Sequence, residues 1–345
     1  MALTAIDLFC GAGGLTCGLK QAGFEIKLGV ELEHVAAETY RINHPEHPLY
    51  EADIRTLDPN VIMKELKIEP GELDLLAGCP PCQGFSSHRT RNKVTSIDDN
   101  RNDLIFDLMR FVHAFQPKVV MIENVPALAK DKRIYLVLNE LNGLGYNIGP
   151  LSLQVKNTAL YGVPQRRKRM ILVVSKFGLV NEPDIIKPQR TVKDAIFNFP
   201  IPGNSGDVLH DIIEKRSERI KKMISLVPKD GGSRAELPKE YWLPCHIRNP
   251  DSYRDVYGRM AWNLVSPTIT GGCINPSKGR FLHPEQNRAI TLREAATLQT
   301  FPSGYYFSLA KGRDFAALMI GNALPPLFIH AHAIKIKEHI ESACR

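Results

Sequence analysis

Short apolar runs alternate with helix-like segments through the first 175 residues, and this alternation constrains the fold more than any other feature. Five apolar runs have the length of strands: residues 4–9, 24–31, 73–77, 118–123 and 170–175. Four segments between them carry apolar residues on one helical face: 15–22, 34–43, 104–115 and 136–144. Strands that alternate with helices predict βαβ units. We therefore expect a doubly wound, mostly parallel α/β sheet that binds ligands at the carboxyl ends of its strands.

The pattern changes near residue 176. From there to residue 285, prolines and glycines are frequent, and only Val208–Val227 has a clear helical pattern. Helical patterns return near 291–299 and 325–341. The chain is therefore expected to have a large domain over 1–175, a smaller irregular domain over 176–285, and a return segment over 286–345 that completes the large domain.

Charge and cysteine content narrow the class of protein. The first 80 residues carry a net charge of −7 and the whole chain +7, so the remainder carries +14. Such a basic segment favours a polyanionic partner, although a solvated basic surface would have the same composition. The 7 cysteines are irregularly spaced, which argues against a secreted disulfide framework and for an intracellular protein. The sequence contains no run of about 18 apolar residues, so a membrane span is not expected.

A glycine-rich turn follows the first predicted strand, in the sequence Asp7-Leu8-Phe9-Cys10-Gly11-Ala12-Gly13-Gly14. Glycines let a ligand approach the backbone, and the amino end of the next helix adds amide donors. A plain tight turn is an equally good interpretation of these glycines alone. Glu31 ends the next strand, where an acid can hold a ribose hydroxyl pair, and Asp53 follows a third. Together these residues predict a nucleoside site.

A second motif, Gly78-Cys79-Pro80-Pro81-Cys82-Gln83-Gly84-Phe85-Ser86, begins directly after the strand at 73–77. Its C-x-x-C spacing could indicate a redox pair, half a zinc site or buried structural cysteines. No second C-x-x-C exists in the sequence, so we expect no metal. We favour Cys82 as a nucleophile, because it follows a strand end and a rigid proline pair.

Two more groups of polar residues flank predicted strands. Glu123 ends an otherwise apolar strand, and a carboxylate there needs a partner or a chemical role; a helix-capping role would suit Asn124 better. Residues 165–169 read Gln-Arg-Arg-Lys-Arg, and alternation puts Gln165, Arg167 and Arg169 on one face. With the basic loop at 84–101, this cluster suggests contacts to phosphates.

At this point the sequence resembles the cytosine-C5 methyltransferases of the bacterial DNA modification type. Six segments match in family order: DLFCGAGG (7–14), Pro81-Cys82-Gln83, Glu123-Asn124-Val125, Gln165-x-Arg167-x-Arg169, TLREAATLQTFP (291–302) and Gly321-Asn322-Ala323-Leu324-Pro325-Pro326. The resemblance covers nearly the whole chain. It implies the methyltransferase version of the doubly wound sheet, with a target-recognition domain over 176–285.

The resemblance also implies S-adenosylmethionine as cofactor and S-adenosylhomocysteine as product. Glu31 would take the ribose hydroxyls, and Asp53 with Ile54 would meet the adenine. The other positions that match the cofactor site are Phe9, Gly11, Ala12, Gly13, Gly14, Leu32, Leu104, Asn322 and Ala323. Leu32 departs from the pattern, since many members have an aromatic residue there, and Thr297 stands where many have arginine.

The same resemblance assigns the chemistry. Cys82 matches the nucleophile that attacks cytosine C6, Glu123 the acid that grips the base, and Arg169 the arginine near the cytosine carbonyl, with Arg167 in a supporting position. The base must be flipped out of duplex DNA to be reached. The expected DNA-binding residues are Gln83, Ser86, His88, Arg89, Arg91, Gln165, Thr268 and Thr270.

Rival interpretations predict other partners. A related branch of the family methylates transfer RNA, a catalytically silent homologue would only bind DNA, and a thiol oxidoreductase would use Cys79 with Cys82. Gly84-Phe85-Ser86 resembles the DNA type, and intact Cys82, Glu123 and Arg169 argue against a silent homologue. We expect a monomeric, cytoplasmic protein that associates with the nucleoid through double-stranded DNA. A cognate restriction endonuclease is a further expected partner, and neither membrane nor metal is.

Overall fold

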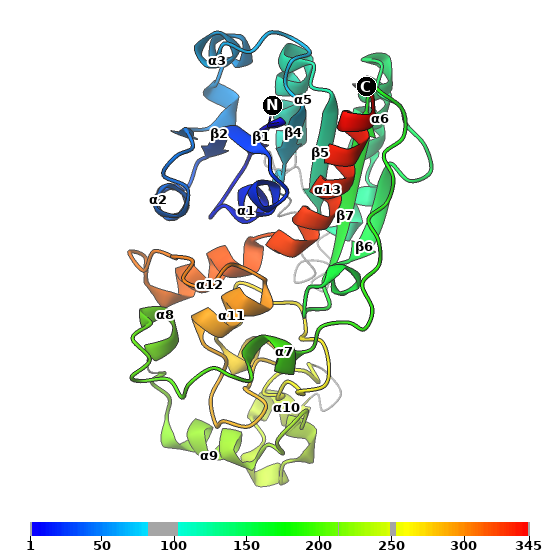
Figure 1. The fold of residues 1–345 in the computed structure, drawn as a ribbon. Helices are drawn as coiled ribbons and strands as arrows, with labels where there is room; N and C mark the ends of the chain where they lie inside the picture. Colours follow the sequence, from blue (N-terminus) through cyan, green and yellow to red (C-terminus); the bar gives the residue numbers. More distant parts are fainter. Residues whose placement is uncertain (1, 82–102, 213, 249–252, 344–345) are drawn as a thin grey trace. The chain divides into compact units, whose positions relative to one another are not determined.

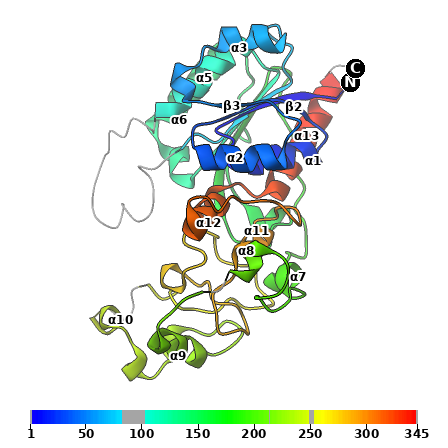
Figure 2. The same cartoon turned by 90° about the vertical axis from the view of Figure 1, so that its left-hand side faces the viewer.

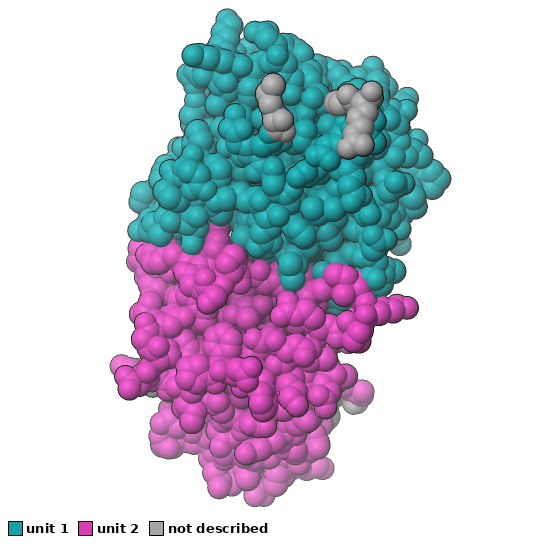
Figure 3. Space-filling model, in the orientation of Figure 1, with its two compact units in different colours: residues 1–161, 168–185, 324–345 teal, residues 162–167, 186–323 magenta. Residues whose placement is uncertain are grey.

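The computed structural model describes residues 2–81, 103–212, 214–248 and 253–343. Contacts divide the chain into two units, which are coloured separately in Figure 3. Unit 1 comprises Met1–Tyr161, Lys168–Ile185 and Leu324–Arg345, and unit 2 comprises Gly162–Arg167 and Ile186–Ala323. The large unit is therefore assembled from both ends of the chain.

Unit 1 is built on a seven-stranded sheet with the order β3-β2-β1-β4-β5-β7-β6 (Figure 1). Its strands are β1 (Thr4–Leu8), β2 (Glu25–Glu31), β3 (Leu49–Glu51), β4 (Leu75–Gly78), β5 (Val119–Asn124), β6 (Leu153–Asn157) and β7 (Lys168–Ser175). The five neighbouring strands β3, β2, β1, β4 and β5 run parallel, whereas β7 is antiparallel to both β5 and β6. This topology confirms the doubly wound, mostly parallel sheet.

Helices cover both faces of the sheet (Figure 2). One face carries α3 (Pro59–Leu66), α5 (Leu104–Phe115) and α6 (Lys132–Gly143), and the other carries α1 (Gly14–Gln21), α2 (His34–Asn43) and α13 (Pro326–Ala343). The core beneath α5 contains Leu108, Phe111, Leu76 and Ile122, which are all fully buried. Burial of such side chains stabilises the fold by about 1.5–3 kcal/mol each, so the layer that contains α5 is firmly held.

The C-terminal helix α13 packs on α1. Gly18 allows this contact, because a Cβ there would lie 2.5 Å from the carbonyl oxygen of Pro326. Among the described residues, Gly312–Ala343 is the single helical stretch long and apolar enough to cross a membrane by length and composition. However, 61% of its most apolar window is buried, as in core helices, and residues 323–325 divide it into α12 (Gly312–Asn322) and α13.

Unit 2 contains short helices and much irregular chain. Its helices are α7 (Val192–Ile196), α8 (Val208–Asp211), α9 (Glu218–Leu226), α10 (Pro244–Arg248), α11 (Leu292–Leu298) and α12. The 3₁₀ helices in the described parts of the two units are η1 (Ile54–Thr56), η4 (Pro126–Lys130), η5 (Thr158–Tyr161), η6 (Arg234–Glu236), η7 (Lys239–Tyr241) and η8 (Pro276–Lys278).

The single helix expected over Val208–Val227 is wrong, because α8 ends at Asp211 and α9 begins only at Glu218. The carboxylate of Asp211 accepts hydrogen bonds from the backbone amides of Gly203, Ser205 and Gly206, and Ile212 is extended with φ −61° and ψ 112°. A side chain that bonds a neighbouring loop in this way competes with continuation of the helix.

Candidate active site

The carboxyl ends of four neighbouring parallel strands meet at one edge of the sheet. The register pairs Leu8 with both Val30 and Gly78, and Gly78 with Ile122. The carboxyl ends of β1, β2, β4 and β5, and the residues that directly follow them, therefore lie at the same edge. An open α/β sheet binds its ligands at this edge. The acids Glu31 and Glu123 and the motif that begins at Gly78 all belong to this edge.

The glycine turn after β1 is bonded to Glu31 at the end of β2. Oε2 of Glu31 accepts a hydrogen bond of 2.8 Å from the amide of Gly11, and Oε1 accepts one of 2.8 Å from the amide of Glu33. Gly11 and Gly13 have φ values of 55° and 89°, in the left-handed region that favours glycine. Apart from Gly11 and its two chain neighbours, no atom of the described residues lies within 4 Å of the position of a Cβ on Gly11, so a ligand can approach the backbone there.

A second acid of the predicted nucleoside site, Asp53, caps the short helix η1. Its carboxylate accepts a hydrogen bond from the amide of Arg55 and pairs with the guanidinium of Arg55, which lowers the pKa of Asp53. Ile54 and Leu104 are both buried in one apolar cluster with α3 and α5. Arg110 of α5, which sequence reasoning missed, donates to the carbonyls of Ile54 and Leu57 and so fixes this segment.

Asp7 lies buried beneath the glycine turn. Its Oδ2 accepts hydrogen bonds of 2.6 Å from the hydroxyl and 3.0 Å from the amide of Thr16, whereas Oδ1 has no hydrogen-bond partner among the described residues. Burial raises the pKa of Asp7 from 3.8 to about 7, although the bonds from Thr16 oppose this shift. Asp7 therefore binds its proton more tightly in the folded protein than in the unfolded chain.

This difference predicts a pH dependence of stability. The contribution of protonated Asp7 is fully present below a pH of about 4 and is lost as the pH rises through about 7. Asp7→Asn removes this loss, so the stability of the variant relative to wild type should increase across that window, by at most about 1.4 kcal/mol per pH unit. Urea unfolding at a series of pH values measures the effect. Parallel curves for the two proteins would contradict it.

Glu123 at the end of β5 forms an ion pair with Arg169 of β7. Nε of Arg169 lies 2.9 Å from Oε1 of Glu123, and the two side chains are 16% and 8% exposed. The antiparallel register pairs Glu123 with Ile171 and Asn124 with Met170, which places the start of β7 beside the end of β5. A partly desolvated carboxylate and guanidinium, side by side, can bind a polar ring that has both donors and acceptors.

Two neighbours complete this arrangement. Cys79 follows Gly78 at the end of β4, and burial together with the negative charge of Glu123 holds the pKa of the Cys79 thiol well above its usual range. Asn124 does not cap a helix; its Nδ2 donates a 2.9 Å hydrogen bond to the carbonyl of Pro80. Asn124 thus fixes the chain that leads to Pro81 and Cys82. The sequence signal for this positioning role is that Asn124 directly follows Glu123 at the end of a predicted strand.

A comparison with known families explains this set of residues. The family model of C-5 cytosine-specific DNA methylases matches residues 3–338. This chain is a C-5 cytosine-specific DNA methylase. The match extends from the start of β1 into α13, and therefore includes both units of the methylase.

Relatives and solved structures agree with this assignment. The methylase is 35% identical to the Type II methylase M.HgiDII of Herpetosiphon aurantiacus, over 97% of this chain and 95% of the relative. It is also 35% identical to the Type II methyltransferase M1.HphI of Haemophilus parahaemolyticus, over 96% and 86%. A candidate DNA modification methyltransferase encoded within an Escherichia coli prophage superposes with a TM-score of 0.74, at 25% identity, over 99% and 100%. The enzyme class is DNA (cytosine-5-)-methyltransferase.

Other expected site residues of the methylase lie within unit 2. Gln165 is fully buried, where it accepts from the amide of Ile269 and donates to Gln299. Arg167 is 1% exposed and donates to the carbonyls of Ile269 and Gly321. Both side chains thus bond the backbone of Ile269, and in the same loop Thr268 is partly exposed and Thr270 is exposed.

Several expected residues of the methylase cannot be placed beside this edge. Six of them lie outside the described residues: Cys82, Gln83, Ser86, His88, Arg89 and Arg91. Asn322 and Ala323 end α12 in unit 2, where the carbonyl of Ala323 accepts a hydrogen bond from Gln299. Leu32, by contrast, directly follows Glu31 at this edge and is 64% exposed. Among the described residues, no group of three or more His, Cys, Asp or Glu side chains could hold a metal ion.

Proposed function

We propose that the protein transfers a methyl group from S-adenosylmethionine to C5 of a cytosine flipped out of a specific duplex DNA sequence. The ion pair between Glu123 and Arg169, at the sheet edge that leads into Pro81 and Cys82, is the observation that carries the proposal. The relatives are named Type II methylases and methyltransferases, which supports DNA as the substrate and a partner restriction endonuclease in the same system.

The cofactor is inferred from the other half of the edge. A glycine turn with open space beside Gly11, and an acid at the end of β2, suit a nucleoside with a vicinal diol. Residues 7–19 contain no basic side chain, so a pyrophosphate group would fit poorly. Bound there, S-adenosylmethionine supplies an electrophilic methyl group. Phe9, Ala12, Gly13 and Gly14 would border it.

The chain's own residues supply the rest of the chemistry. The Cys82 thiolate adds to cytosine C6, which moves electron density to C5 and makes that carbon the nucleophile. Glu123 donates a proton to N3 and accepts from the amino group, while Arg169 neutralises charge on the carbonyl oxygen O2. After C5 has taken the methyl group it loses its proton to a base, and N3 returns its proton to Glu123. The C6–sulfur bond then breaks and returns its electron pair to Cys82.

A covalent trap tests this proposal. Duplex DNA with 5-fluorocytosine at the target position should capture the enzyme when S-adenosylmethionine is present, because fluorine cannot leave C5 as a cation. The adduct should withstand denaturing electrophoresis, and its peptide should contain Cys82. An unsubstituted duplex is the matched control. Absence of an adduct on every duplex would overturn the proposal, and an adduct on transfer RNA instead would reassign the substrate.

The cofactor site has its own expected result. Glu31→Ala removes the carboxylate that binds the amide of Gly11 and is assigned to the ribose hydroxyls. The variant should bind S-adenosylmethionine more weakly by about 1–3 kcal/mol, as measured by calorimetry. Glu25→Ala, at the opposite end of the same strand, is the control and should bind normally. Equal affinity of the two variants would remove Glu31 from the site.

Domain roles and cellular context follow from the same proposal. We assign methyl transfer to residues 1–175 with 286–345, and target recognition to 176–285. Thr268 and Thr270, in the surface loop fixed by Gln165 and Arg167, would contact DNA. The enzyme would act as a monomer in the cytoplasm, associated with DNA.

A further inference from the structure

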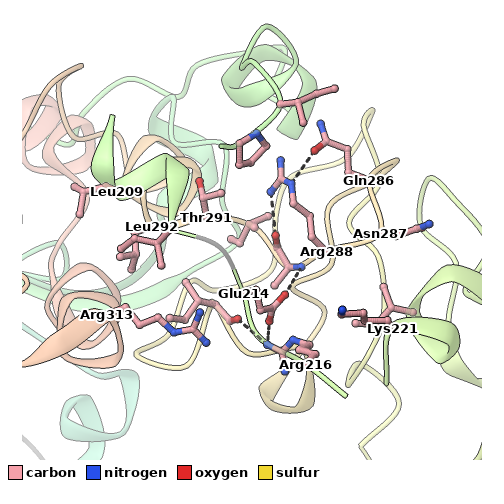
Figure 4. A pocket seen from close by; sticks show the side chains of 17 residues that line it. Leu209, Glu214, Arg216, Lys221, Gln286, Asn287, Arg288, Thr291, Leu292 and Arg313 are labelled. Carbon is pink, nitrogen blue, oxygen red and sulfur yellow. Dashed lines mark hydrogen bonds and ion pairs between the residues drawn. The ribbon is translucent and has the colours of Figure 1, made fainter. Parts of the chain in front are cut away.

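Unit 2 contains a cavity with a volume of about 270 Å³ that the proposed methyl transfer does not use (Figure 4). Its walls come from the chain around α8 and α9, from the segment that precedes α11, and from the start of α12. Most of the wall is aliphatic, contributed by Ile201, Leu209, Ile212, Ile224, Ile290 and Leu292. An apolar wall with a few convergent polar groups is the usual composition of a small-molecule site.

Four cationic side chains also line the cavity, against one acidic side chain, Glu214. Arg288 is neutralised by two hydrogen bonds of 2.7 Å to Glu294. Glu214 forms an ion pair with Arg216, and Lys221 pairs with the exposed Glu218. This pairing leaves the fourth cation, Arg313, for which the described residues provide neither an ion pair nor a hydrogen bond. The cavity therefore has excess positive charge.

Arg216 and Arg313 face the same part of the cavity (Figure 4). Nε of Arg216 is buried and has no hydrogen-bond partner among the described residues. Burial lowers the pKa of Arg216, and the positive charge of Arg313 adds to the shift while Tyr257 opposes it. The buried Nε donor without an acceptor destabilises the empty site, and Arg313 still repels the guanidinium of Arg216 although Glu214 pairs with it. An anion with several acceptor oxygens would relieve both.

We propose that this cavity binds the phosphate group of a phosphate ester between Arg216 and Arg313, with the organic part of the ester against Leu209 and Leu292. Guanidinium groups match phosphate oxygens in a forked geometry, which favours a phosphate over a halide or other simple anion. The aliphatic wall favours an ester over inorganic phosphate. Two sources share this chemistry: a free mononucleotide and a phosphodiester of the DNA backbone.

Calorimetry with thymidine 5′-monophosphate on the full-length enzyme tests the first source. This probe has neither the adenosine of the cofactor nor the amino group of cytosine, so it avoids the proposed active site. Arg313→Gln should weaken binding at least tenfold at constant ionic strength, and thymidine without its phosphate should bind at least tenfold more weakly than the nucleotide. Arg219→Gln removes the same charge from an exposed position of α9 that does not line the cavity, and should bind like wild type.

The second source is tested by the salt dependence of duplex DNA binding, measured with the same variants. If the DNA backbone supplies the phosphate, Arg313→Gln should reduce the slope of log affinity against log salt by about one relative to Arg219→Gln. Arg313→Lys should restore part of the affinity in whichever assay responds. Identical behaviour of Arg313→Gln and Arg219→Gln in both assays would overturn the proposal. Neither assay requires methyl transfer, so the result is independent of the function proposed above.

Discussion

Cys82→Ser is expected to abolish methyl transfer, with kcat lower by at least about 10³-fold. Only a group that ionises near neutral pH can add to cytosine C6, and a serine hydroxyl has too high a pKa where a cysteine thiol does not. The variant should still bind S-adenosylmethionine and duplex DNA, since the assigned binding residues are unchanged. Single-turnover transfer of a labelled methyl group measures the loss, and calorimetry measures retained cofactor binding.

Cys79→Ser is the matched control, three residues earlier in the same motif. The pKa of the Cys79 thiol is held well above its usual range by burial and by Glu123, so this thiol is a poor nucleophile. The variant should therefore stay active and form the 5-fluorocytosine adduct. Equal loss of activity in the two serine variants would instead favour a joint role for the cysteines, as in a thiol oxidoreductase.

Glu123→Gln has the second largest expected effect, a fall in kcat of about 10²–10⁴-fold. Glutamine has nearly the same shape, but it can neither shuttle a proton to cytosine N3 nor carry the charge that pairs with Arg169. Cofactor affinity should change little, because Glu123 is assigned to the base. Single-turnover kinetics with saturating DNA would separate the chemical step from binding.

Glu140→Gln provides the control for this variant. Glu140 lies on α6 of the same unit, and its carboxylate contacts the imidazole of His113 at the surface, so its replacement also removes a carboxylate that has a polar partner. It should leave kcat unchanged. If Glu123→Gln and Glu140→Gln were equally active, the pair of Glu123 and Arg169 would be structural, and thermal unfolding would then show the larger loss of stability for Glu123→Gln.

Local sequence patterns were sufficient for most of the large unit. The helices at His34–Asn43 and Leu104–Phe115 have the bounds that their periodicity predicts, and the apolar runs became β1, β2, β4, β5 and β7. These elements are buried along one face or on both, so their hydrophobic pattern reflects the final packing. The match to the family of cytosine-C5 methylases confirms the assignment drawn from six short motifs.

Two elements differ from what local sequence patterns predict. The edge strand β6 is only partly buried, so it lacks the continuous apolar run of a central strand. The helix expected over Val208–Val227 is divided, because Asp211 bonds a loop eight residues before it. The apolar periodicity over residues 208–227 does not predict this competing hydrogen bond, because the bond depends on the fold of the loop at Gly203.

The sequence by itself determined most of the individual strands, the glycine turn, the acids at the strand ends and the motif that contains Cys82. Each of these features depends on residues that lie close together in the chain. Tertiary structure alone decided which side chains meet. Arg169 reaches Glu123 only because β7 enters the sheet antiparallel to β5. Arg216 and Arg313, nearly a hundred residues apart, share a cavity for the same reason: contacts between distant segments follow from packing and strand register, which local periodicity does not encode.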